Sequence, residues 1–180
     1  MAKKKKHTAF RVQVAAAIIA CLSGLGLALV VGVRLLPEAG WQLPFDLRFF
    51  GYSFETAEGY LTAITPLGRD WYGGPFRVLD TLFPLSVGLW LSLLALRRGR
   101  GLAASAAAGA ATLFAAADLS ENYTLMQLMA GPLPPDAALV VQANFLTMAK
   151  YGLILLAFVL LAKSWVVKPQ AKRGSETNGK

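Results

Sequence analysis

Four long runs of apolar residues divide the chain, and most of its charged residues lie between or beside them. The runs cover about residues 12–36, 76–96, 102–130 and 137–163. A transmembrane α-helix needs about 20 predominantly apolar residues to cross the hydrocarbon core of a bilayer, and each run supplies them. The pattern therefore predicts an all-α fold, in which residues 12–165 form a single four-helix transmembrane bundle.

The first run is best interpreted as an uncleaved transmembrane helix. Val14 to Val33 is a stretch of 20 uncharged residues that follows Lys3 to Lys6 and Arg11 and stops before Pro37. A cleaved signal peptide would have an apolar region of about 7 to 15 residues. Lipoprotein processing at Cys21 is a second alternative, but the uncharged sequence continues for twelve residues beyond that cysteine.

Small residues recur every fourth position along this predicted helix. They are Ala20, Gly24, Ala28 and Gly32. Such a stripe lets another helix approach closely. We expect it to pack within the molecule, and the alternative is a homo-oligomer formed through the same stripe.

The connection over residues 37–75 is rich in aromatic residues, with nine of the chain's 19 between positions 37 and 74. Aromatic rings favour the headgroup level of a membrane, which predicts a loop on the membrane surface. Ser53 can cap a short helix from Phe54 to about Thr65, with Pro66 after it. Phe54, Ala57, Leu61 and Ile64 would share one face of that helix. It would be a plain interfacial helix or, alternatively, a lid over the bundle.

The second run contains one acidic residue, Asp80, and a proline four residues later. Pro84 cannot donate a hydrogen bond to the carbonyl of Asp80, and its ring displaces that carbonyl. One position therefore gains a carboxylate and a free backbone acceptor. Arg77, one turn before Asp80, can neutralise the carboxylate.

The third and fourth runs contain the other ionisable residues at membrane depth. Asp118, Glu121 and Asn122 lie at i, i+3 and i+4, so they share one face of a helix. The alanine-rich half before them suits close contact with several neighbours, which predicts a central position for this helix. The fourth helix, for which Asp136 is an expected N-cap, has Lys150 near its middle.

Composition and charge agree with a membrane protein. The 180 residues are 56% hydrophobic and 16% charged, whereas a soluble domain has about 25% charged residues. The net charge of +8 is concentrated in the tail 1–11, in the Arg97 to Arg100 turn and in the tail 166–180, which is expected to be disordered. The positive-inside rule then predicts a multi-pass protein of the plasma membrane with both termini cytoplasmic. It also explains the basic residues without a nucleic-acid partner.

The single cysteine and the single histidine exclude several kinds of site. Cys21 and His7 are too few ligands for a Cys/His zinc site. Because His7 lies in the basic tail, a Ser-His-Asp or Cys-His hydrolase site is also excluded. Magnesium or calcium would suit the acidic residues, but Lys150 competes for the same carboxylates. We therefore expect no metal and no cofactor.

A rise of about 1.5 Å per residue places Lys150 at the depth of Asp118 and within reach of Glu121. If Lys150 and Arg77 each neutralise one of the three acids, one carboxylate remains. We therefore predict that Asp118 or Glu121 is protonated at rest, or that a cation or basic ligand completes the site. The structural alternative is that Asn122, Ser120, Tyr123 and Thr147 satisfy all these groups. The predicted ligand-binding residues are Asp80, Asp118, Glu121, Asn122, Lys150 and Tyr52.

Short motifs give the chain a resemblance to a group of uncharacterised bacterial four-span integral membrane proteins. The motifs are Gly51-Tyr52-Ser53, Asp80 with Phe83-Pro84, Asp118-x-x-Glu121-Asn122 and Lys150, and the likeness runs from about Phe50 to Lys163. The resemblance implies the topology and the site residues, and it names no activity. The chain lacks the paired cysteines of enzymes that resemble vitamin K epoxide reductase. It also lacks the histidine expected of sterol-isomerase-like domains.

Three functions fit this sequence. The first is a membrane protein whose polar pocket, in the outer half of the bundle, binds a membrane lipid, another small ligand or a proton. The second is a membrane enzyme in which Glu121 or Asp118 acts as acid and base and Lys150 steadies charge. The third is proton-coupled transport by an oligomer, because one copy shows no inverted repeat.

Overall fold

The computed structural model describes residues 2–166, and in this range the chain is helical with no β-strand. Four helices are long and apolar enough to cross a membrane, which confirms the predicted all-α fold with four spans. They cover His7–Glu38, Pro66–Arg98, Gly101–Ala130 and Ala137–Val166. The tail at 167–180, predicted to be disordered, lies outside the described residues.

The first helix is longer than its apolar run. Helix α1 (Ala2–Val30) includes most of the basic segment, and it continues through a π-helical turn, η1 (Val31–Leu35), into α2 (Leu36–Glu38). Pro37 lies in α2, directly before the end of this continuous helix, and it has no N–H to donate to the π-helical turn before it. The chain then reverses at Gly40 and Trp41, which have φ angles of 60° and 64°.

The loop after α2 folds back onto the bundle. It contains one turn of 3-10 helix, η2 (Phe45–Leu47), and then helix α3 (Phe54–Ala63). The predicted N-cap is confirmed, since the Ser53 hydroxyl accepts a hydrogen bond from the Thr56 N–H at 3.3 Å. Ala57, Tyr60 and Leu61 of α3 are buried, so this helix covers one end of the bundle.

The second span begins at Pro66 and not near Phe76 as expected. Thr65 accepts a hydrogen bond from the Gly68 N–H at 3.1 Å, and Pro66 takes the first helical position. Helix α4 (Pro66–Trp71) therefore starts at the proline that the sequence suggested as a helix end. It continues through a π-helical turn, η3 (Tyr72–Phe76), into α5 (Arg77–Arg98), and this turn accommodates Pro75.

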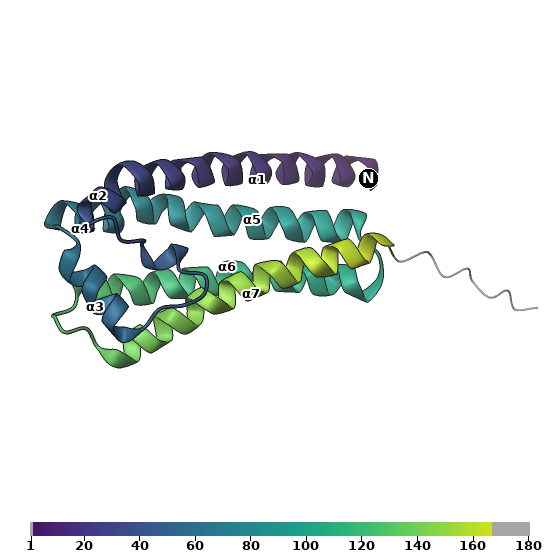
Figure 1. The fold of residues 1–180 in the computed structure, drawn as a ribbon. Coiled ribbons are helices and arrows are strands. Elements are labelled where there is room, and N and C mark those ends of the chain that lie inside the picture. The colour runs from purple at the N-terminus through teal and green to yellow at the C-terminus, as the bar shows by residue number, and fades with distance from the viewer. Residues whose placement is uncertain (1, 167–180) are drawn as a thin grey trace, which may run out of the picture.

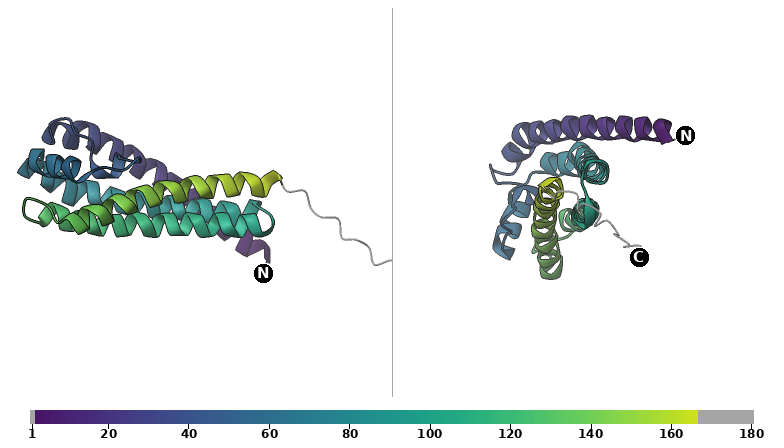
Figure 2. Two further views of the ribbon diagram at one scale, coloured as in Figure 1. Left: turned by 60° about the horizontal axis from the view of Figure 1, so that its bottom comes forward. Right: turned by 90° about the vertical axis from the view of Figure 1, so that its right-hand side faces the viewer.

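Helices α6 (Gly101–Ala130) and α7 (Ala137–Val166) form a long hairpin closed by the proline-rich turn. The predicted cap of α7 is confirmed, because Asp136 Oδ1 accepts from the Ala138 N–H at 2.7 Å. Helix α6 packs against both α5 and α7, and α1 packs against α5. Figures 1 and 2 show α1 beside α5, and α6 beside α7. The central position predicted for α6 is confirmed.

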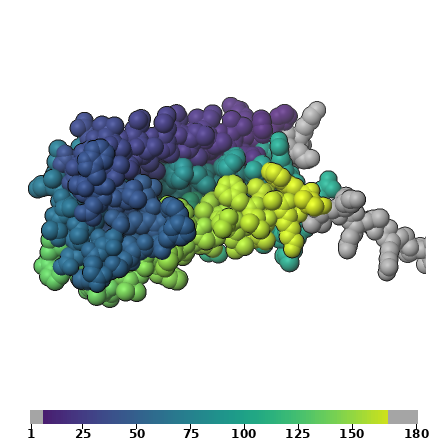
Figure 3. Space-filling view, in the orientation of Figure 1, coloured from purple at the N-terminus to yellow at the C-terminus, as the bar shows by residue number. Residues whose placement is uncertain are grey.

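The bundle has two different ends (Figure 1). At the end that we call the loop end, α3 and α4 cover the helices, and the aromatic side chains of Phe45, Tyr60, Tyr72 and Phe76 are buried in one core cluster. Figure 3 shows that this covering extends over one side of the molecule. The other end, the terminal end, contains the start of α1, the α5–α6 turn and the end of α7. Its core consists mainly of alanines and leucines from α5, α6 and α7.

Candidate functional site

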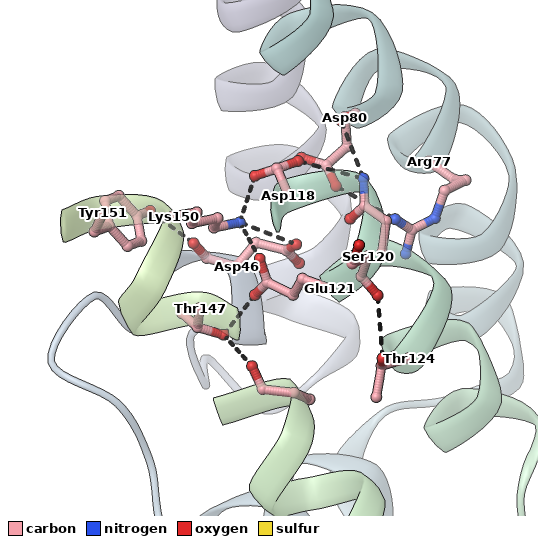
Figure 4. Close-up of polar contacts among 12 residues, drawn as sticks. Asp46, Arg77, Asp80, Asp118, Ser120, Glu121, Thr124, Thr147, Lys150 and Tyr151 are labelled. Carbon is pink, nitrogen blue, oxygen red and sulfur yellow. Dashed lines mark hydrogen bonds and ion pairs between the residues drawn. The ribbon is translucent and has the colours of Figure 1, made fainter. Parts of the chain in front are cut away.

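The predicted partners of Lys150 surround it in the interior of the bundle (Figure 4). Its Nζ atom lies 2.8 Å from Asp118 Oδ1 and 2.5 Å from Glu121 Oε2. Helix α7 supplies the lysine and the neighbouring helix α6 supplies both acids, one turn apart. The contact expected from equal depth in the membrane is therefore confirmed.

A third acid, Asp46, lies beside the same lysine and comes from the loop, and no pattern in the sequence indicated it. Its Oδ1 atom lies 3.8 Å from Lys150 Nζ, although the two residues are 104 positions apart. The hydroxyl of Tyr72 donates to Asp46 Oδ2, and that of Tyr151 donates to the Asp46 backbone carbonyl at 2.7 Å. The two tyrosines, neither of them predicted, therefore hold η2 against η3 and α7.

The backbone acceptor freed by Pro84 has a specific partner. The Asn122 amide donates to the Asp80 carbonyl at 3.2 Å and lies 3.4 Å from Asp118 Oδ2. The Asp80 carboxylate lies 3.4 Å from Arg77 Nη1, as expected for residues one turn apart. Asn122 thus connects the proline-distorted turn of α5 to the acidic face of α6.

Glu121 is completely buried, with 0% of its surface exposed, and it contacts Thr147 as well as Lys150. Thr147 Oγ1 lies 2.5 Å from Glu121 Oε1 and 3.0 Å from the Ala143 carbonyl. A hydroxyl has one proton to donate. Thr147 therefore donates to only one of these two oxygens, and its contact with Glu121 is compatible with either a neutral or an ionised carboxyl group.

A cavity of about 500 Å³ adjoins these polar residues. Asp46, Asp80, Asp118 and Lys150 lie on its wall, and Glu121 does not. The opposite wall is apolar and comes from the first helix. That wall consists of Gly24, Leu27, Ala28, Val31, Gly32 and Leu36. Three members of the predicted small-residue stripe therefore border the cavity, while the ring of Phe83 would meet a Cβ added at Gly24 at 3.0 Å.

Other predicted residues lie elsewhere. Tyr52 packs against Phe45, with its backbone N–H bonded to the Asn144 side chain at 2.8 Å, and it does not line the cavity. Burial raises the pKa of the Tyr52 hydroxyl above its usual value, so the hydroxyl stays neutral. Ser120 and Tyr123 are exposed, which removes them from the group proposed to satisfy the charges.

Asp46 enlarges the charge imbalance of the site. Four carboxylates now meet two cations, Lys150 and Arg77, which leaves two negative charges if every acid ionises. The Lys150 ammonium occupies the space between Asp118 and Glu121 that a cation would take. Within residues 2–166, no group of three His, Cys, Asp or Glu side chains is arranged to hold a metal ion.

Comparison of the chain with protein-family models, with curated proteins and with solved structures gave no match. The site therefore has to be interpreted from its own chemistry.

Proposed function

We propose that this chain is a multi-pass plasma-membrane protein that holds a small or lipidic ligand in the cavity beside Lys150. The observation that carries the proposal is the pairing of a polar wall with an apolar wall. The volume of about 500 Å³ falls within the range of small-molecule sites, about 300–1,000 Å³. Burying charged groups at membrane depth costs free energy, which favours a functional role over packing alone.

The proposed orientation places the loop end outside the cell and both termini in the cytoplasm. It follows from the positive-inside rule, because the start of α1, the α5–α6 turn and the end of α7 share one end of the bundle. The cavity would then lie in the outer half of the bundle. The likeness to bacterial four-span proteins remains part of this proposal.

The geometry supports binding better than the enzymatic or transport alternatives. A catalytic acid or base must lie within hydrogen-bond reach of its substrate, and Glu121 does not border the cavity. Asp118, the other candidate, does border it, but Lys150 and Asn122 already occupy both of its carboxylate oxygens. Transport needs access from both sides. The half of the bundle near the termini is instead filled by closely packed alanines and leucines such as Ala111 and Leu91.

Two glycine substitutions provide a matched test of the cavity. A Cβ at Gly32 or at Gly109 meets no atom within 4 Å, but only Gly32 lines the cavity. Native mass spectrometry of the protein in lipid nanodiscs should detect a bound lipid or other small molecule. We expect Gly32→Phe to lose this molecule and Gly109→Phe to retain it. Equal retention by both variants would contradict the proposal.

A further inference from the structure

The carboxylates on the cavity wall differ in how fully they are already bound. Asp118 contacts Lys150 at 2.8 Å and the Asn122 amide at 3.4 Å, so both of its oxygens have a partner. Asp46 is only 4% exposed, yet its Oδ1 atom makes no hydrogen bond and has Lys150 no closer than 3.8 Å. Asp80 has Arg77 at 3.4 Å, a long contact for an ion pair. Asp46 and Asp80 therefore retain capacity to accept hydrogen bonds.

The same groups determine which charge a ligand would need in order to neutralise the site. Lys150 is shared by Asp46, Asp118 and Glu121, so it has no capacity left for an anion. A proton on Asp118 or Glu121, as predicted from the sequence, would remove one of the two surplus negative charges. One negative charge then remains beside the cavity. An anionic or neutral head group would leave it unpaired, whereas a single positive charge would neutralise it.

The rest of the cavity suits a hydrocarbon chain. The side chains of Leu27, Val31 and Leu36 line it and have no polar atom, and Gly32 in η1 leaves open space beside them. Gly24 and Gly32 are eight residues apart, which is about 12 Å of helix. Gly32 and Leu47 are exposed while they line the cavity, so it opens at the surface of the bundle. A ligand that lies in the membrane could therefore enter from the side.

We infer that the cavity binds an amphiphile with one positively charged amine head group, which lies against Asp46 and Asp80 while its apolar chain follows the first helix from Gly24 to Leu36. This inference rests on the proposed function, since it names the class of ligand for the same cavity. The amine of this ligand would donate hydrogen bonds to the free Asp46 oxygen and to Asp80. Charge-assisted bonds of this kind are about twice as strong as neutral ones.

Three chain-matched probes test the head group. Octylamine, octanol and octanoate would be titrated at pH 7 into the full chain in lipid nanodiscs, with empty nanodiscs as the blank and calorimetry as the readout. An alkylamine is protonated at this pH, as a lysine side chain is. We expect octylamine to bind about a hundredfold more tightly than octanol, about tenfold for each of the two charge-assisted hydrogen bonds. Octanoate should bind more weakly than both.

Two single substitutions test the residues. Asp46→Asn and Asp80→Asn each remove one carboxylate from the cavity wall, and Asp70→Asn removes one exposed acid that does not line the cavity. We expect the preference for octylamine over octanol to fall about tenfold in the first two variants and to stay unchanged in the third. Circular dichroism would show that each variant is folded. The comparison of octylamine, octanol and octanoate on the unsubstituted protein does not depend on the folding of any variant.

The possible results separate the two proposals. Equal binding of octylamine and octanol, or tighter binding of octanoate, would overturn the amine inference and leave the ligand-binding function standing. Absence of all binding above empty nanodiscs would overturn both. An octylamine preference that is unchanged in Asp46→Asn and in Asp80→Asn would overturn the assigned residues.

Discussion

Lys150 is the residue on which the buried charges depend, because three carboxylates lie within 4 Å of its ammonium. Removing Lys150 leaves several acids without a cation, whereas removing one acid reduces the existing surplus of negative charge. Lys150→Met should therefore lower the free energy of unfolding by about 3–5 kcal/mol. Glu121→Gln, which keeps donors and acceptors near Lys150 and Thr147, should lower it by less than about 1.5 kcal/mol.

Unfolding of both variants by sodium dodecyl sulfate in lipid bicelles, followed by tryptophan fluorescence, would measure this difference. The double variant Lys150→Met/Glu121→Gln should recover part of the stability lost in Lys150→Met. If Glu121→Gln costs as much as Lys150→Met, the excess of negative charge that we infer is wrong.

Asn122 and Pro84 should be energetically coupled through the Asp80 carbonyl. Asn122→Ala leaves this buried acceptor without its donor, at an expected cost of about 1–3 kcal/mol. Pro84→Ala restores an N–H that can bond to the same carbonyl, so Asn122→Ala should cost less in that background. A double-mutant cycle in bicelles would give the coupling, expected at about 0.5–3 kcal/mol. Additive losses would show that Asn122 stabilises the protein by another route.

The residues of the site could be predicted where they lie on regular helices. Equal depth was enough to pair Lys150 with Asp118 and Glu121, and the chemistry of proline was enough to mark the Asp80 carbonyl. Asp46 could not be found in this way, because no periodicity fixes the position of an irregular loop relative to the helices. The only local signal is an acid between two apolar residues, Phe45 and Leu47, in a loop expected to lie at the membrane surface.

At the scale of the helices, close packing of α5 on α6 depends on Gly88. A Cβ at this position would lie 2.9 Å from the Ala111 carbonyl oxygen and 3.0 Å from Ala115 Cβ, and neither can rotate away. Gly88→Ala should therefore force the helices apart and cost about 1–3 kcal/mol in the bicelle assay.

Gly109 on the exposed side of α6 provides the control for this substitution. A Cβ there meets no atom within 4 Å, so Gly109→Ala should gain about 0.5–1 kcal/mol from improved helix propensity. Equal effects of Gly88→Ala and Gly109→Ala would mean that the contact between α5 and α6 does not limit stability.

The hydropathy pattern predicted the third and fourth helices to within a few residues, since both are bounded by turns with clear sequence signals. It did not predict the helical start of the second span. Pro66 permits a helix end or a first helical turn, and the Thr65 cap decides for the second. The π-helical turn around Pro75 was also unforeseen, because proline in a helical run usually indicates a break.

At the scale of the whole molecule, the proposed orientation can be tested with single cysteines. In a Cys21→Ala background, Asp70→Cys lies at the loop end and Arg100→Cys at the terminal end, and both positions are exposed. A membrane-impermeant maleimide should label Asp70→Cys in intact cells and Arg100→Cys only after permeabilisation. The reverse pattern would invert the topology.

The cavity is a property of the whole bundle, since it is bordered by four long helices and by the loop that carries Asp46. Helix α1 packs mainly on α5 and helix α7 mainly on α6, so the apolar wall and Lys150 come from two helices that do not pack mainly on each other. A bound amphiphile would contact both of these helices at once.

Photo-crosslinking tests this central claim most directly. An octylamine with a diazirine in its chain would be activated in nanodiscs containing the protein, and the modified peptides would be identified by mass spectrometry. We predict adducts concentrated on the segment Gly24–Leu36 and at Tyr151, and competed by unlabelled octylamine. Adducts spread over exposed apolar residues outside the cavity, such as Leu113 and Phe158, without competition, would contradict a ligand site in the cavity.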